Sequence, residues 1–84
     1  MINLEELIQD YGLEYLEWLE VDVCDIEVKE LKVIDYQATK VLYFFKENIY
    51  LKFEGHYNSY SKYDWNYPII VQPKNKLITV FESL

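Results

Sequence analysis

Several residue types that build familiar functional sites are scarce or missing in this chain. All eight cationic side chains are lysines, so no guanidinium group is present for bidentate recognition of phosphate, which weakens a nucleotide-binding interpretation. Cys24 is the only cysteine, which excludes an internal disulfide and a cysteine-rich zinc site and fits a reducing compartment. His56 is the only histidine. Since a nucleophile with its base needs such residues, we predict that the protein is not an enzyme.

Long apolar runs are also missing. No segment approaches the roughly 20 apolar residues that span a bilayer, and residues 1–12 lack the basic and apolar regions of a signal peptide. We therefore expect a cytoplasmic protein that makes no membrane contact. The chain has 84 residues, of which 51% are hydrophobic and 27% are charged, and this composition predicts one globular domain over residues 1–84.

Acidic residues are concentrated in the first part of the chain. Residues 1–35 contain eleven acids and two lysines, a net charge of −9, whereas residues 36–84 have a net charge of +2. This asymmetry disfavours direct contact with nucleic acid and favours a basic protein as the partner. The candidate partner-binding acids lie a few residues apart: Glu14, Glu17, Glu20, Asp22, Asp25 and Glu27.

Two interpretations of these acids remain open. They form either a hydrated face without function or a negative surface that mimics the regular charges of a phosphate backbone. Their spacing does not match the ligand set of an EF-hand, and we therefore predict no bound metal or cofactor.

A second candidate site is the segment HYNSYSKYDWNYP, between His56 and Pro68, which combines turn composition with large rings. Rigid rings bury much area at low entropic cost and recur at recognition surfaces. The candidate anchoring residues are Tyr57, Tyr60, Tyr63 and Trp65. In the structural alternative, the three tyrosines form one face of a short helical turn, while Trp65 and Tyr67 close the end of a small core. Trp18 and Cys24 are both expected in the core.

The first part of the chain has helical periodicity. The apolar positions 4, 7, 8 and 11, with Asn3 as the N-cap and Gly12 as the terminator, predict a helix from about Asn3 to Tyr11. Residues 13–20 predict one more helical turn or an irregular stretch, and the alternation at positions 19, 21 and 23 then predicts a strand. From Ile26 the two-fold pattern slips in phase at Lys29–Glu30, which predicts a β-bulge.

The second part is rich in strand-forming residues. Residues 40–46 and 49–54 predict a hairpin that turns at Glu47–Asn48, with Ile49, Leu51 and Phe53 facing the core. We expect Gly55 to end this strand and to open the aromatic loop. Residues 68–82 predict either a strand interrupted at Pro73 or a hairpin with residues 73–76 at its tip. The fold class is therefore α+β: a short N-terminal helix packed on a four- to five-stranded antiparallel sheet.

The C-terminal third contains a glycine, a Tyr-x-Ser-Tyr segment with a later tryptophan, and a strand that passes through a proline. These features are Gly55, Tyr57, Ser59, Tyr60, Trp65 and Gln72–Pro73, followed by the segment TVFE at 79–82. In them the chain resembles small proteins of bacteriophage and prophage genomes. In charge and size, the acidic half is similar to inhibitors that phages encode against host defence, including anti-CRISPR proteins.

This resemblance implies a phage-encoded, non-enzymatic inhibitor in the cytoplasm of a bacterial host. Its partner would be a defence protein with a basic nucleic-acid-binding groove, bound by the chain as a monomer or homodimer. Two alternatives remain: an immunity-type protein that neutralises a basic toxin or nuclease, and a small enzyme or metal binder.

Overall fold

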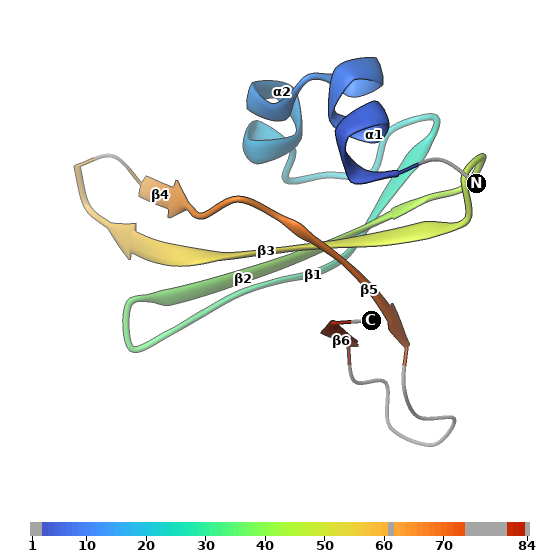
Figure 1. Cartoon of the computed structure of the whole chain (residues 1–84). Helices are drawn as coiled ribbons and strands as arrows, with labels where there is room; N and C mark the ends of the chain where they lie inside the picture. The colour runs from blue at the N-terminus through green and yellow to red at the C-terminus, as the bar shows by residue number, and fades with distance from the viewer. Residues whose placement is uncertain (1–2, 61, 74–80, 84) are drawn as a thin grey trace.

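The computed structural model describes residues 3–60, 62–73 and 81–83, which form two short helices and an antiparallel sheet (Figure 1). Figure 1 shows the helices together on one face of the sheet. The elements are, in chain order, α1 (Leu4–Tyr11), α2 (Leu13–Trp18), β1 (Ile26–Ile34), β2 (Gln37–Phe44), β3 (Ile49–Asn58), β4 (Lys62–Trp65), β5 (Ile69–Pro73) and β6 (Phe81–Ser83).

The predicted first helix is confirmed together with both of its ends. The side chain of Asn3 accepts a hydrogen bond from the Glu6 amide at 2.8 Å, which satisfies one of the free donors at the helix N-terminus. At the other end, the Gly12 amide donates to the Ile8 carbonyl at 2.7 Å. Gly12 has a φ of 89°, a conformation that other residues rarely adopt, and it lets α2 begin at once after α1.

The sheet has the strand order β1-β2-β3-β5-β6, and β4 pairs with β3 beside this path. All of these pairings are antiparallel, which confirms the α+β class with a helical N-terminus on an antiparallel sheet. With β4 the sheet has six strands. The predicted bulge is confirmed by a register shift between Val28 and Glu30. The predicted hairpin of β2 and β3 is present, but its turn takes residues 45–48 instead of Glu47–Asn48 alone, because β2 ends at Phe44. Asn48 has a φ of 56° in this turn, a conformation that asparagine adopts more readily than most residues.

The core lies between the helices and the sheet. Leu7 of α1 and Leu16 of α2 are fully buried against the strands. Leu19, which follows α2, and the inward-facing side chains of the three long strands complete this cluster: Ile26, Leu42, Phe44, Ile49, Leu51 and Phe53. The predicted core positions of β3 are therefore confirmed, and burial of this apolar surface holds the helices on the sheet.

The strand predicted around residues 19–23 is wrong, and so is the burial of Cys24. Apart from an isolated bridge between Val23 and Ile26, residues 19–25 pair with no strand, and Val21 is 68% exposed. Asp22 accepts a hydrogen bond from the Val28 amide at 2.8 Å, so a side chain takes the place of a strand partner. Cys24 lies in the tight turn between the bridge residues and is exposed.

The aromatic segment is a β-hairpin, which corrects both the predicted loop and the predicted helical turn. Strand β3 continues through Gly55 to Asn58, and β4 pairs with it, so that Tyr57 faces Tyr63 and Gly55 faces Trp65. Further along, β5 pairs with β6, which agrees with the hairpin alternative for the C-terminal segment. The predicted tip residues 74–76 lie outside the described residues.

Gly55 allows the close approach of β3 and β4, and we expect Gly55→Ala to destabilise the protein. An added Cβ would lie 2.9 Å from the Asp64 carbonyl carbon and 2.9 Å from the Trp65 Cα, both of which are backbone atoms. Because backbone cannot move aside without separating the strands, the free energy of unfolding should fall by about 1–3 kcal/mol in urea denaturation. His56→Ala, at the exposed neighbouring position, is the matched control and should unfold like wild type.

Candidate partner-binding site

A buried lysine connects the end of α2 to the sheet. Lys40 of β2 is 0% exposed, and its ammonium donates to the carbonyls of Leu16 at 2.6 Å, Glu17 at 2.7 Å and Leu19 at 3.1 Å. The last carbonyls of a helix have no partner within the helix, and a cation there also interacts favourably with the helix dipole. Lys40 therefore fixes the position and the end of α2.

The environment of Lys40 shifts its pKa but leaves it charged at neutral pH. Burial lowers the pKa of Lys40 from 10.5 to about 8, and the carboxylates of Glu20 and Glu17 oppose this shift. Its three carbonyl partners use all three protons of the ammonium form. The ammonium also lies 4.9 Å from the ring centre of Phe53 and 5.1 Å from that of Trp65, within the range of cation–π attraction.

The rings of the hairpin form a connected row on the helix side of the sheet. Trp65 stacks on Tyr63 with ring centres 5.0 Å apart and an interplanar angle of 7°, and Tyr63 meets Tyr57 edge-on at 5.2 Å. Trp65 also packs edge-on against Phe53 of the core at 6.0 Å. Its indole N–H donates to the Glu17 carbonyl at 3.1 Å, so β4 is attached to α2 directly.

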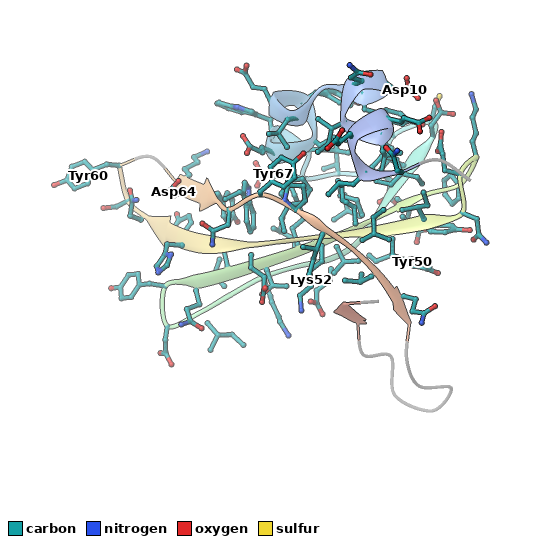
Figure 2. All side chains as sticks on the ribbon, in the orientation of Figure 1. Asp10, Tyr50, Lys52, Tyr60, Asp64 and Tyr67 are labelled. Carbon is teal, nitrogen blue, oxygen red and sulfur yellow. The ribbon has the colours of Figure 1, made fainter. Side chains whose placement is uncertain are left out.

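A cavity of about 250 Å³ opens between α2 and β4, and we refer to it as the α2–β4 cavity. Glu17, Trp18 and Glu20 line it on the helix side. The strand side is formed by Lys62, Tyr63, Asp64 and Trp65. Figure 2 shows Asp64 on β4, to the left of the helices and on the side toward Tyr60. The residues that line the cavity are thus three aromatic, three acidic and one basic.

The carboxylates of this cavity make no ion pair among the described residues, although Glu20 and Glu17 interact electrostatically with the buried Lys40 ammonium. The ion pairs there join Lys29 to Glu27, Lys32 to Glu30, Lys46 to Asp25 and Lys52 to Glu54. Burial, and then the charge of Glu20, raises the pKa of the Tyr63 phenol above its ordinary value of 10.0. The negative charge of Glu20 therefore acts on the aromatic wall of the cavity.

The structure divides the predicted acidic residues into two groups. Glu17 and Glu20 line the cavity, and Glu14 is exposed on the same short helix. Asp25 and Glu27 are paired with lysines at 3.6 Å and 3.1 Å, and Asp22 accepts the Val28 amide. These three lie before, in and after the turn between Val23 and Ile26, and none of them lines the cavity.

The predicted aromatic anchors are divided as well. Tyr63 and Trp65 line the cavity, and Tyr57 lies behind Tyr63 in the ring row. Tyr60 is 98% exposed at the tip of the hairpin, where Figure 2 shows it projecting away from the other side chains. Tyr67 is also exposed, which contradicts its predicted role in closing the core.

Four site residues were missed by the sequence interpretation: Trp18, Lys40, Lys62 and Asp64. Trp18, expected in the core, is 75% exposed and lines the cavity. It follows Leu16 by two positions and therefore falls outside the apolar face of α2, which is the signal for its exposure. Lys40 lies two positions from Ala38 and two from Leu42 on β2, so strand periodicity places it on the same inward face as these apolar residues.

Comparisons with protein-family models, with curated proteins and with solved structures found no match to this chain. None of the described helices is long and apolar enough to cross a membrane. Within the described ranges, no group of three or more histidine, cysteine or acidic side chains is placed to hold a metal ion.

Proposed function

We propose that this protein is a non-enzymatic inhibitor that binds a basic, nucleic-acid-binding protein through the α2–β4 cavity. The observation that supports this proposal is the meeting of unpaired carboxylates and large rings in one concave site. Carboxylates at such a site replace the phosphates that a cationic groove normally binds, and the rings supply buried area.

The mechanism is competition for the groove. The net charge of −7 accelerates encounter with a cationic surface, and this effect weakens as salt increases. Contacts with Trp18, Tyr63 and Trp65 then slow dissociation, since most differences in affinity between related complexes arise from the off-rate. Tyr60 adds a contact where the partner surface extends to the hairpin tip.

The proposed setting is the cytoplasm of a bacterial host, and the proposed target is a defence complex that handles DNA or RNA. Two features support this part of the proposal: the phage-like pattern of the C-terminal third and the acidic first half of the chain. The paired acids Asp22, Asp25 and Glu27 contribute to the long-range field rather than to the contact.

The proposal predicts that the carboxylates of α2 and the cavity are needed for inhibition. The triple variant Glu14→Gln, Glu17→Gln, Glu20→Gln should fold normally, because its side chains are not part of the core. Host proteins captured by wild type are purified, and displacement of a labelled oligonucleotide from each is followed by fluorescence anisotropy. The triple variant should be at least about tenfold weaker than wild type at low salt, mostly through a slower on-rate.

The matched control removes the same charge from α1 through Glu5→Gln, Glu6→Gln and Asp10→Asn, all at exposed positions. This control should displace the oligonucleotide almost as well as wild type. Equal losses in both variants would show a nonspecific effect of net charge, and failure of wild type to displace any oligonucleotide would exclude the proposed inhibition.

A further inference from the structure

We propose that the α2–β4 cavity receives an arginine side chain of the partner. This inference rests on the proposed function, because it names the group on the basic partner that enters the site. Two features of the cavity support it: an exposed indole, and acidic residues that make no ion pair among the described residues. A lysine of the chain itself also lines the cavity, and its charge provides a test of the sign of the occupant.

The exposed indole is Trp18. The residue is 75% exposed, and among the described residues its side chain has neither a ring partner nor a hydrogen bond. The other two rings of the cavity are already engaged, since Tyr63 and Trp65 stack on each other and Lys40 lies over Trp65. Trp18 therefore offers the open aromatic face, and tryptophan is the side chain that attracts cations most strongly.

The carboxylates favour a guanidinium over an ammonium. Glu17 and Glu20 stand on the same side of the cavity as Trp18, and Asp64 stands opposite. A planar guanidinium can stack on an indole while its N–H groups donate in the plane to carboxylates on either side. An ammonium is a compact and strongly hydrated charge, and it cannot make both contacts in this way.

Lys62 is the cation that the chain itself places at the cavity. It makes no ion pair among the described residues, and its φ of 62° is uncommon for a residue with a side chain. Its ammonium lowers the negative potential that an incoming cation experiences. Removal of this charge should therefore strengthen binding of a cation, an effect opposite to that expected if the cavity received an anion.

The test is an NMR titration of the ¹⁵N-labelled chain with N-acetyl-arginine amide. The neutral citrulline amide and the lysine amide serve as matched probes. The arginine probe should bind with millimolar affinity and shift the indole signal of Trp18 and the amide signals of Glu20 and Asp64. Lysine amide should bind more weakly, and citrulline amide should cause no saturable shift.

Variants sharpen this test in both directions. The double variant Glu17→Gln, Glu20→Gln should bind the arginine probe about threefold or more weakly than wild type. Trp18→Ala should weaken binding of the probe by a similar factor. Lys62→Gln should bind the arginine probe about twofold more tightly than wild type. The control variant Glu5→Gln, Glu6→Gln should bind the probe with unchanged affinity.

Several results would overturn the inference: no saturable shift with arginine amide, an equal shift with citrulline amide, tighter binding of lysine amide, or weaker binding in Lys62→Gln. Because these titrations need no partner, they are independent of oligonucleotide displacement. If the protein displaces the oligonucleotide but does not bind the arginine probe, the inference about arginine is wrong and the proposed inhibition is not affected. Arginine binding without displacement would support the cavity as an arginine site and overturn the proposed inhibition.

Discussion

Lys40→Ala is expected to remove about 3–5 kcal/mol from the free energy of unfolding. The substitution leaves the carbonyls of Leu16, Glu17 and Leu19 without their ammonium donor, and it opens a space beneath Phe53 and Trp65. A domain of this size has a total stability of about 4–12 kcal/mol. Urea denaturation followed by circular dichroism should therefore show a greatly lowered midpoint or a largely unfolded population.

Two controls separate the contributions of Lys40. Lys40→Met keeps most of the volume but removes the charge, so it should be less destabilising than alanine. Lys46→Ala removes a lysine from an exposed ion pair with Asp25 and should cost no more than about 1 kcal/mol. If Lys40→Ala and Lys46→Ala have equal stabilities, the bonds from Lys40 to α2 do not contribute as the structure indicates.

The same lysine should give the protein a characteristic pH dependence. The pKa of Lys40 is about 8 in the folded chain and 10.5 as its ordinary value, so between these values the unfolded chain binds more protons. The free energy of unfolding therefore rises as the pH rises from about 8 to 10.5, and below about 8 this group gives no further pH dependence. Wild type should gain about 1 kcal/mol from pH 7 to pH 9, and Lys40→Met should not. The raised pKa values of Tyr11 and Tyr63 act in the opposite direction at higher pH, which sets the upper limit of the measurement.

Features determined by neighbouring residues were predictable from the sequence. The Asn3 cap, the Gly12 terminator and the bulge before Glu30 each depend on side chains within a few positions of one another. The alternation of apolar residues likewise identified the inward face of β3. Local propensity and periodicity agree with the fold at these positions, and this agreement gave the correct fold class.

The aromatic hairpin was missed because its composition conceals its periodicity. Tyr63 and Trp65 alternate with Lys62 and Asp64, which is the two-fold pattern of a strand, but the surrounding small polar residues are typical of a turn. Gly55 was interpreted as the end of a strand, whereas its missing side chain allows β4 to approach. A glycine inside a strand has this second meaning, and only the pairing register distinguishes the two.

The cavity depends on contacts between distant parts of the chain. The hydrogen bond from Trp65 to the Glu17 carbonyl joins residues 48 positions apart, and no local pattern indicates such a pairing. The acidic residues are close in sequence, but Glu17 and Glu20 line the cavity, whereas Asp25 and Glu27 pair with Lys46 and Lys29. Proximity in sequence suggested one acidic stripe, and these different partners are not visible in it.

Trp65→Ala is expected to be the second severe lesion. Its ring packs on Phe53 and Tyr63 and donates to the Glu17 carbonyl, so truncation removes core packing and the attachment of β4 to α2. The cost should be about 3–5 kcal/mol, and the melting temperature should fall by well over ten degrees at about 4–8 °C per kcal/mol. Trp65→Phe keeps a ring but removes the N–H donor. Loss of this hydrogen bond should lower the free energy of unfolding by about 1 kcal/mol, in addition to the packing that is lost because phenylalanine is smaller.

Tyr60→Ala is the control for Trp65→Ala, because both substitutions remove a large ring from the same hairpin. Tyr60 is 98% exposed, so its removal should leave the melting temperature within about two degrees of wild type. Its effect should fall on binding to the partner alone. If calorimetry shows that Trp65→Ala has the same melting temperature as wild type, the ring row is not part of the core. If the melting temperature of Tyr60→Ala is instead as low as that of Trp65→Ala, the hairpin tip packs against the protein and cannot serve as a free contact surface.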